Sequence, residues 1–502
     1  MIDHQTITAT LPRHVRARPD TIAVVCDGHT VTWKELDRAV DRLAAHLAGV
    51  IPAGRGVALH LPNSPALVLL FLAAARAGRE AQILDPGWPA EMTRAAIGEL
   101  SPGLVITHDP ALSVESHALT LVDPHGPFET VVEVIGASPS SQAVREPDPL
   151  TPFYVGFTSG STGLPKGYRR HHLSWVESFR AGDREFDIGA NDVVLAPGAL
   201  THSLFLYGLA HGLYVGATVI LCRQFRPNLA CRLMAKHQVT VLYGVPTQLE
   251  MTVETATREQ APPLTTMRWV LSSGAKWPGR VMEGLRAHFP ASRFAEFYGA
   301  SELSFVTVVK DDEDVPPDSV GRAFAGVDLS IRDHRGQRLP PGEAGQVFVA
   351  SPFVFMDYAC GGTAALLRDG DAMSVGDIGT LDARGYLRLV GRASRMIVTS
   401  GKNVHPEEIE RVLESHPTVM AAAVLGIDDE RRGERLLALL RLHPDLSVAA
   451  SDLIVHARSH LPLYKIPRRF ALPPRWPLTP SGKNDFAALR RIWESERCQV
   501  LR

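Results

Sequence analysis

One short segment of the chain concentrates the residue types that bind phosphate groups. Residues 157–167 read Phe-Thr-Ser-Gly-Ser-Thr-Gly-Leu-Pro-Lys-Gly, with three glycines, four hydroxyl side chains and one lysine. Glycine permits backbone angles that other residues disfavour, so backbone amides can approach an anion closely. The segment therefore predicts a polyphosphate-binding loop, against the alternative of a polar turn without function. It is not a Walker A loop, because Pro165 precedes its lysine and Gly167 follows it.

At this loop the sequence resembles the adenylate-forming superfamily of acyl-CoA synthetases, peptide-synthetase adenylation domains and beetle luciferases. The resemblance recurs in order along nearly all of the 502 residues, and it lies nearest to bacterial fatty-acid or aryl acyl-CoA ligases. It implies that the loop binds ATP. The loop residues to which it assigns this role are Thr158, Ser159, Gly160, Ser161, Thr162, Gly163 and Lys166.

A second element, Phe297-Tyr-Gly-Ala-Ser-Glu302, resembles the Tyr-Gly-x-Thr-Glu motif of that family, with a serine in place of the threonine. The resemblance implies that Tyr298 packs on adenine beside Gly299. It also implies that Ser301 meets the α-phosphate and that Glu302 holds Mg²⁺. Mg²⁺ is usually bound by one or two carboxylates together with substrate phosphates, which fits this assignment. In isolation, Glu302 would be interpreted as a surface charge.

Three weaker motifs extend the resemblance around the nucleotide. Gly274 and Ala275 lie in a Ser-Gly-Ala segment whose backbone lines the adenine and acyl pockets in the family. Asp377, in Val375-Gly-Asp377, is expected to accept hydrogen bonds from the ribose hydroxyls, as a carboxylate does in dinucleotide sites. Arg392 is expected to reach the same ribose. A solvated charge is the alternative for each ionic residue.

The C-terminal part of the sequence supplies the remaining implied residues. Pro477-Leu-Thr-Pro-Ser-Gly-Lys483 resembles the loop that carries the catalytic lysine, so Lys483 would bridge the attacking carboxylate and the α-phosphate. Gly401 would leave room for the pantetheine arm of coenzyme A. The sequence departs from the family where Arg395 replaces the hinge Asp or Lys, and again at Val398 and Phe486. The position of the domain pivot therefore stays open.

The acid is expected to lack an α-amino group. His202 resembles the gating histidine of acyl-CoA synthetases, although a buried structural histidine is the alternative. Amino-acid-activating relatives place an aspartate just after it, where this chain has Ser203, and a buried ammonium without a carboxylate would be costly. Tyr207, Tyr243 and Trp277 are expected to line the acyl pocket, which favours a fatty or aryl acid.

The order of elements predicts an α/β fold. Apolar strand-like runs such as residues 21–25, 56–61 and 192–198 alternate with helix-like stretches, which indicates parallel sheets covered by helices. The resemblance implies an N-terminal domain over 1–391, made of two sheet-and-helix subdomains and a small β-barrel. A small mobile α+β domain over 392–502 would follow, with the active site at the junction.

Composition narrows the function classes. A net charge of -2 gives no basic excess for nucleic-acid binding. Five cysteines without a CxxC pair argue against a disulfide framework or a zinc site. The N-terminal segment does not resemble a signal peptide. The apolar run 66–75 is too short to span a membrane and fits a buried helix, so a cytoplasmic protein is expected.

The predicted activity is ATP- and Mg²⁺-dependent conversion of a carboxylic acid to an acyl-adenylate, followed by transfer to coenzyme A. Loading of a separate acyl or peptidyl carrier protein is the main alternative. A catalytically silent binding or scaffold protein is a second alternative, and the set Lys166, Glu302, Asp377, Arg392 and Lys483 argues against it. No feature supports oxidative luciferase chemistry. The oligomeric state is open, a homodimer included.

Overall fold

The structure is a computed structural model that describes most of the chain in two compact units. The described residues are 5–112, 118–120, 123–136, 144–158, 165–274, 277, 279–361, 366–399, 402–429, 433–478, 484–495 and 497–501. The first unit comprises Met1–Leu329, Val349–Ala364 and Asp371–Met373, and the second comprises Ser330–Phe348, Ala365–Gly370 and Ser374–Arg502. The domain boundary at residue 391 stays a prediction.

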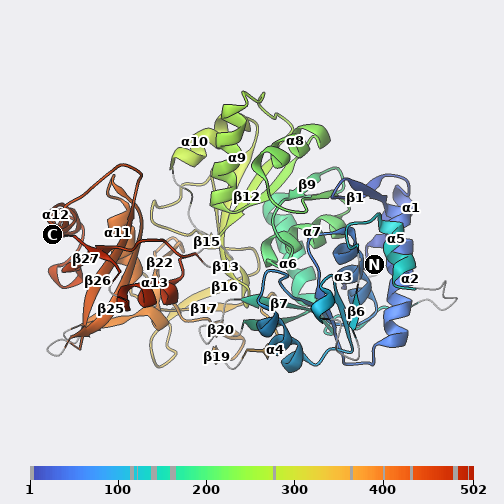
Figure 1. Ribbon diagram of the computed structural model, residues 1–502, viewed down its shortest axis with the longest axis horizontal. Helices are drawn as coiled ribbons and strands as arrows, with labels where there is room; N and C mark the ends of the chain where they lie inside the picture. Colours follow the sequence, from blue (N-terminus) through green and yellow to red (C-terminus); the bar gives the residue numbers. More distant parts are fainter. Residues whose placement is uncertain are drawn as a thin grey trace. The chain divides into compact units, whose positions relative to one another are not determined.

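The first unit contains a nine-stranded sheet in the order β15-β14-β13-β12-β11-β9-β10-β1-β2. Figure 1 labels β1, β9, β12, β13 and β15 of this sheet. The strands from β13 to β1 in this order are parallel, and antiparallel strands β14, β15 and β2 extend the two edges. Their bounds are β1 (Ile22–Cys26), β2 (His29–Thr32), β9 (Val193–Ala196), β10 (Thr218–Leu221), β11 (Val241–Gly244), β12 (Trp269–Ser273), β13 (Arg293–Ala300), β14 (Ser304–Lys310) and β15 (Arg322–Ala323).

A second sheet of the same unit has seven strands in the order β18-β8-β7-β4-β3-β5-β6. The strands from β7 to β6 are parallel, whereas β8 and β18 add antiparallel at one edge. Their bounds are β3 (Val57–His60), β4 (Ala81–Ile83), β5 (Leu104–Thr107), β6 (Ala118–Thr120), β7 (Pro152–Thr158), β8 (Lys166–His171) and β18 (Tyr358–Cys360). Within this unit, Ala372 and Met373 of β20 (Ala372–Ser374) pair with Ala350 and Val349 of β17 (Gly345–Ala350).

The helices of the first unit precede or connect its strands, and parallel neighbouring strands need such crossover connections. They are α1 (Leu11–Ala17), α2 (Trp33–Val50), α3 (Pro65–Arg76), α4 (Ala90–Leu100), α5 (Phe128–Val134), α6 (His172–Phe186), α7 (Ser203–Val215), α8 (Pro227–His237), α9 (Pro246–Arg258) and α10 (Gly279–His288). All twelve residues of α3 are buried, which confirms the prediction of a buried helix over 66–75. A helix that is apolar on every side must lie inside the fold.

The parallel strands place the predicted site residues at their carboxyl ends. β7 ends at Thr158, β12 ends just before Gly274, and β13 ends at Ala300. Because β12 and β13 are parallel neighbours, the segments that follow them leave the same edge of the sheet. Ligands of open α/β sheets bind at this edge.

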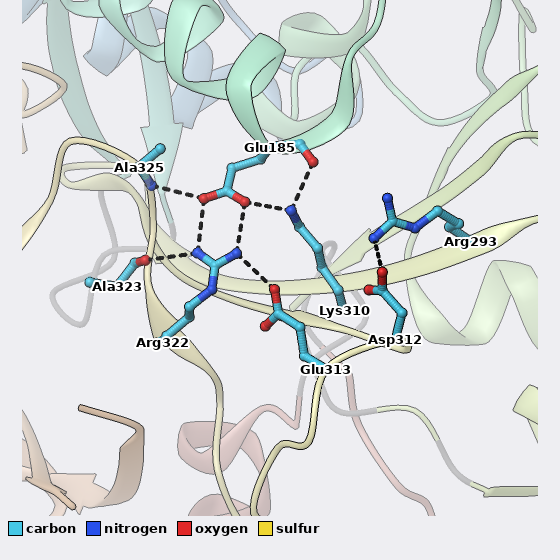
Figure 2. Close-up of polar contacts among 8 residues, drawn as sticks. All are labelled: Glu185, Arg293, Lys310, Asp312, Glu313, Arg322, Ala323 and Ala325. Carbon is cyan, nitrogen blue, oxygen red and sulfur yellow. Dashed lines mark hydrogen bonds and ion pairs between the residues drawn. The ribbon is translucent and has the colours of Figure 1, made fainter. Parts of the chain in front are cut away.

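An ion network fixes the hairpin of β13 and β14 to the end of α6 (Figure 2). Glu185 near the end of α6 is 8% exposed and lies 2.6 Å from the Lys310 ammonium. Arg322 donates to both carboxylate oxygens of Glu185, at 2.9 and 3.0 Å, and to Glu313 at 2.8 Å. The backbone N–H of Ala325 also donates to Glu185. Three donors thus compensate one buried carboxylate and anchor the strand that follows Glu302.

The described part of the second unit contains one antiparallel sheet, one mixed sheet in which β26 (Gly433–Leu442) and β27 (Arg469–Leu472) are parallel, and three α-helices. In the antiparallel sheet, β16 (Asp328–Arg332) pairs with β17, which pairs with β21 (Asp377–Leu381), and β21 pairs with β22 (Leu387–Arg392). The mixed sheet also contains β23 (Ile397–Thr399), β24 (Lys402–Val404), β25 (Val419–Asp429) and β28 (Gln499–Val500). The remaining elements are β19 (Leu367–Asp369), α11 (Pro406–Glu414), α12 (Ala450–Arg458) and α13 (Phe486–Glu494).

The predicted α/β fold class is confirmed. The strand-like runs 21–25, 56–61 and 192–198 form β1, β3 and β9. All five cysteines are free thiols. Cys26, Cys222 and Cys360 are buried, and Cys231 and Cys498 are partly buried. Within the described part of the chain, every helix is too short or too polar to cross a bilayer.

Candidate functional site

The phosphate-loop segment joins β7 to β8. Thr158 and Lys166 are register partners in this antiparallel pair, so the two ends of the loop lie side by side. Ser159, Gly160, Ser161, Thr162 and Gly163 lie outside the described residues, and their assignment to ATP stays a prediction. Cys360 of β18 pairs with Gly167 on the other side of β8. A Cβ on Gly167 would lie 2.8 Å from the Cys360 sulfur, so close strand packing requires glycine there.

The turn between β13 and β14 carries the second motif. The register between the strands shifts at Tyr298 and Gly299. A Cβ on Gly299 would lie 2.1 Å from the backbone carbonyl oxygen of Ser304, so only glycine permits this hairpin. Ser301 and Glu302 occupy the turn, which a hydrogen bond from Leu303 N to Ala300 O closes at 3.0 Å.

Tyr358 links the two motifs, and sequence reasoning did not identify it. Its hydroxyl donates a hydrogen bond of 2.8 Å to Oε1 of Glu302. The ammonium of Lys166 lies over the Tyr358 ring, 5.9 Å from its centroid, within the range of a cation–π interaction. Burial, followed by the negative charge of Glu302, raises the pKa of Tyr358. The tyrosine therefore stays protonated and can only donate to the carboxylate.

The buried side chain of Arg170 holds the turn between β13 and β14 through hydrogen bonds to backbone carbonyls. Arg170 on β8 is 2% exposed and donates to the backbone carbonyls of Ser301, at 2.6 Å, and of Phe353. Burial lowers the pKa of Arg170 to about 10, although Tyr168 and Glu302 oppose the shift. It therefore remains charged at neutral pH. The Arg169-Arg170 pair shortly after the predicted phosphate loop is the sequence signal that could have pointed to it.

Tyr168 forms a buried pair with Tyr154, and two predicted site residues affect its pKa. The Tyr154 and Tyr168 hydroxyl oxygens are 2.9 Å apart, and both rings are buried. Burial raises the pKa of Tyr168, and the hydroxyls of Ser203 and Ser301 are among the groups that oppose this shift. One of these serines is predicted for the acyl pocket and the other for the α-phosphate.

His202 and Ser203 begin α7, with His202 at the N-cap position. Asn63 holds the preceding loop, because its side-chain amide donates to Gly198 O at 2.8 Å and its oxygen accepts from Leu200 N at 2.8 Å. α7 contains no acidic residue. The start of this helix therefore offers hydroxyl and imidazole groups but no carboxylate for an ammonium.

The three aromatic residues predicted for the acyl pocket are all buried, and their role in that pocket stays a prediction. Tyr207 and Tyr243 are buried with ring centroids 6.4 Å apart, and the Tyr207 hydroxyl donates to Ser178 O at 3.0 Å. Trp277 packs in a core cluster, with its ring centroid 6.0 Å from that of Phe294. Gly274 follows β12 with a positive φ of 101°, while Ala275 lies outside the described residues.

In the second unit, Asp377 and Arg392 are register partners on β21 and β22. Arg392 Nε donates to Asp377 Oδ1 at 2.8 Å, and the Asp377 carboxylate is buried while the arginine side chain is 55% exposed. The two residues predicted for the ribose therefore contact each other. Gly401 and Lys483 lie outside the described residues, so their roles stay predictions.

Arg395, at the predicted hinge, is fixed within the second unit. It donates to Glu410 at 2.6 Å and to Glu407 at 3.1 Å, both on α11. Its guanidinium also lies over the ring of Phe486, 3.6 Å from the centroid. Arg395 and Phe486 both depart from the family pattern, and the structure places them in contact.

Comparisons with known proteins identify the class. Residues 11–359 match the family model described as AMP-binding enzyme, and residues 408–483 match the AMP-binding enzyme C-terminal domain. The chain therefore belongs to the AMP-binding enzyme family, and the prediction of an adenylate-forming enzyme is confirmed.

Individual relatives give a finer view. An uncharacterized acyl–CoA ligase of Bacillus subtilis is 37% identical over 98% of this chain and 99% of its own. A fatty acid–[acyl-carrier-protein] ligase of Streptomyces coeruleorubidus is 31% identical over 97% of each chain. The ATP-bound MatB of Rhodopseudomonas palustris is similar with a TM-score of 0.86 and 25% identity, over 98% of this chain and 100% of its own.

A second solved structure was determined with nucleotide and metal. The o-succinylbenzoate coenzyme A synthetase of Bacillus subtilis, in complex with ATP and magnesium ion, has a TM-score of 0.81 and 25% identity. The match covers 96% of this chain and 98% of that one. The relatives thus include enzymes that are named for coenzyme A and one that is named for a carrier protein.

Proposed function

We propose that this enzyme activates a carboxylic acid with ATP and transfers the acyl group to coenzyme A. In the first half-reaction a carboxylate oxygen attacks the α-phosphorus, which forms acyl-AMP and releases pyrophosphate. In the second, the thiolate of coenzyme A attacks the acyl carbon and AMP leaves. The observation that carries this proposal is that Tyr358 contacts both Lys166 and Glu302, one residue from each predicted nucleotide-binding motif.

The predicted site residues each have a physical role in the proposed reaction. The Lys166 ammonium and the Ser301 hydroxyl suit the phosphate groups of ATP, because both can donate hydrogen bonds to phosphate oxygens. Ser203 and His202, at the start of α7, would face the acid carboxylate near the α-phosphate. Lys483 would supply positive charge to the attacking oxygen and the α-phosphate in the transition state. Gly401 would border the path of the thiol.

The chemistry of the donor set fits magnesium. Among the described residues no group of three or more histidine, cysteine or acidic side chains could enclose a metal ion. Glu302 provides a single partly buried carboxylate beside the triphosphate-binding lysine. Mg²⁺ binds through few protein carboxylates because substrate phosphates and water complete its shell. When bound, the ion would supply charge neutralisation for the triphosphate.

The acid is proposed to be fatty or aryl and to lack an α-amino group. The absence of acidic residues from α7 supports this restriction, since a buried ammonium needs a compensating charge. The buried rings of Tyr207 and Tyr243 leave an apolar and aromatic environment on the same helix and the neighbouring strand. The names of the relatives do not agree on one acid.

A carrier protein is the second candidate acceptor, because one relative of 31% identity is named as a carrier-protein ligase. The test supplies the purified enzyme with ATP, Mg²⁺ and a fatty or aryl acid, together with either coenzyme A or phosphopantetheinylated carrier proteins. We expect mass spectrometry to detect acyl-CoA with equimolar AMP and pyrophosphate. Acylation of a carrier protein at a much higher kcat/KM than coenzyme A would replace the proposed acceptor.

A further inference from the structure

Tyr358 occupies a position that no binding motif of the sequence includes, yet it contacts one residue of each phosphate-binding motif. Its hydroxyl meets the Glu302 carboxylate, and its ring face meets the Lys166 ammonium. The tyrosine reaches both because β18 pairs with β8, which begins at Lys166, and because the turn after β13 lies next to β18. The Tyr358 side chain thus contacts both the Lys166 ammonium and the Glu302 carboxylate, the two charged groups that are proposed to face the triphosphate.

The Glu302 turn is held at more than one point by the segment 353–358. Phe355 N donates to the backbone carbonyl of Glu302 at 2.8 Å, while Tyr358 donates to its carboxylate. Arg170 bridges the carbonyls of Ser301 and Phe353. Because the backbone contacts already fix where Glu302 lies, the Tyr358 hydroxyl has a narrower role, which is to select the direction of the carboxylate.

A hydrogen bond to one carboxylate oxygen has a chemical consequence for the other. Among the described residues, Tyr358 supplies the side-chain donor to Glu302, and it engages Oε1. A donor on one oxygen fixes the rotation of the carboxylate and leaves the second oxygen available to a cation. Partners of this kind orient metal ligands, and their loss typically weakens metal affinity by about 10- to 100-fold.

The ring has a separable role. A lysine side chain has several flexible carbon–carbon torsions, so holding its ammonium in one place costs conformational entropy. The face of the Tyr358 ring offers the ammonium a favourable electrostatic surface. Phe355 packs against the Tyr358 ring, with the two ring centroids 5.0 Å apart. The ring therefore stays in place whether or not its hydroxyl is present.

We propose that Tyr358 is a positioning residue for Mg²⁺–ATP, with its hydroxyl orienting Glu302 toward the metal and its ring orienting Lys166 toward the triphosphate. The inference rests on the proposed function, because it takes Glu302 as the metal ligand. It assigns a role to a residue outside the family motifs that the sequence displays.

The two roles can be separated with two variants. Tyr358→Phe removes the hydroxyl and keeps the ring, whereas Tyr358→Leu removes both. ATP binding is measured by isothermal titration calorimetry without any acid, so no turnover occurs. Each protein is titrated with ATP in EDTA and then at a series of MgCl₂ concentrations. Thermal unfolding is recorded first, so that binding is compared only at temperatures where each variant is folded.

The expected results differ for the two variants. Tyr358→Phe should bind ATP in EDTA as the unmodified enzyme does, but should require about 10- to 100-fold more Mg²⁺ for the same gain in affinity. Tyr358→Leu should show that shift and also a several-fold weaker affinity for ATP in EDTA. Tyr386→Phe is the matched control, since Arg384 lies over the Tyr386 ring in the second unit, and it should change neither quantity.

Two results would overturn the proposal, and they are distinguishable from failure of the proposed function. An unchanged Mg²⁺ requirement in Tyr358→Phe, with a raised requirement in Glu302→Gln, would leave Glu302 as the ligand and make Tyr358 structural. Equal loss of ATP affinity with and without Mg²⁺ in Tyr358→Phe would also refute it. If Glu302→Gln itself had the normal Mg²⁺ requirement, the metal assignment in the proposed function would fail. In the double variant Tyr358→Phe/Glu302→Gln, the losses of Mg²⁺ affinity from the two substitutions should be less than additive, because both substitutions act on the same contact.

Discussion

The guanidinium of Arg395 lies 3.6 Å from the centroid of the Phe486 ring, and both residues are points at which the second unit departs from the family pattern. The same guanidinium donates to Glu410 and Glu407 of α11. Glu410 is 8% exposed, and burial raises its pKa although Arg395 opposes the shift. Arg395 therefore compensates a buried carboxylate.

Replacing Arg395 with methionine is expected to destabilise the second unit. The substitution leaves Glu410 buried without its cation, and breaking a buried pair in this way costs about 3–5 kcal/mol. Chemical denaturation followed by circular dichroism would measure the loss. The double variant Arg395→Met/Glu410→Gln should recover part of it. A double variant no more stable than the single one would contradict the proposed compensation.

The Arg395→Met loss should also depend on pH. A buried carboxyl without its cation has a folded-state pKa above its ordinary value, so the folded state holds the proton more tightly than the unfolded state. The stability of the variant should therefore fall as the pH rises above the ordinary range of a glutamate and recover in acid. Denaturation midpoints for the variant between about pH 5 and 8 would test the sign. A midpoint that rose across that range would contradict it.

The network around Glu185 should give the opposite pH dependence (Figure 2). Burial opposes ionisation there, but Arg322 and Lys310 outweigh it and lower the pKa of Glu185. The unfolded state then binds the proton more readily than the folded state. The contribution to stability is complete above the ordinary pKa of a glutamate and is lost as the pH falls through the lowered value.

Glu185→Gln should therefore lower stability at neutral pH and flatten the acid limb of the stability curve. Removing one partner of a buried ion pair costs about 3–5 kcal/mol of stability. The loss should be smaller here, because the Arg322 side chain is 35% exposed and water screens its charge. Asp312→Asn is the control, because Asp312 and its partner Arg293 are half-exposed. An acid limb in Glu185→Gln as steep as that of the unmodified protein would refute the assignment.

The sequence predicted most of the fold because the apolar runs and their spacing reflect burial in parallel sheets. Ser203 and Ser301 were predicted because each belongs to a motif; both oppose the raised pKa of Tyr168, and their roles stay predictions. Tyr358 could not be predicted, since a single tyrosine far from Lys166 and Glu302 carries no local pattern. Trp277 was expected to line the acyl pocket, and it packs in a core cluster; its role in the pocket stays a prediction, because aromatic residues fill cores and pockets alike.

Lys483→Ala is expected to impair the first half-reaction and to spare the second. Loss of one preorganised charge contact in a transition state reduces the rate by about 10²–10³. In the thiol step the attack is at the acyl carbon and not at the α-phosphorus, so this step depends less on the Lys483 charge. Single-turnover assays of acyl-AMP formation, and of thioester formation from supplied acyl-AMP, would separate the steps. Equal loss in both would contradict the assignment.

α-Amino acids are expected to be poor substrates, because α7 begins with Ser203 and contains no acidic residue. Matched pairs test this directly, with phenylalanine compared to 3-phenylpropanoic acid and leucine to 4-methylpentanoic acid. The two members of each pair differ only in the ammonium group. AMP formation with the amino acid should be at least about 10²-fold slower, since a buried unpaired charge costs several kcal/mol. Comparable rates within a pair would show that the ammonium is accommodated.

Formation of an acyl-adenylate is the central step of the proposed reaction, and pyrophosphate exchange tests it most directly. The enzyme is incubated with ATP, Mg²⁺, labelled pyrophosphate and one carboxylic acid at a time, without any thiol. Because acyl-AMP formation is reversible, we expect label to enter ATP only when a suitable fatty or aryl acid is present, and Glu302→Gln to slow that exchange. Acid-independent exchange, or acid-dependent formation of ADP and phosphate in place of AMP and pyrophosphate, would contradict adenylate formation.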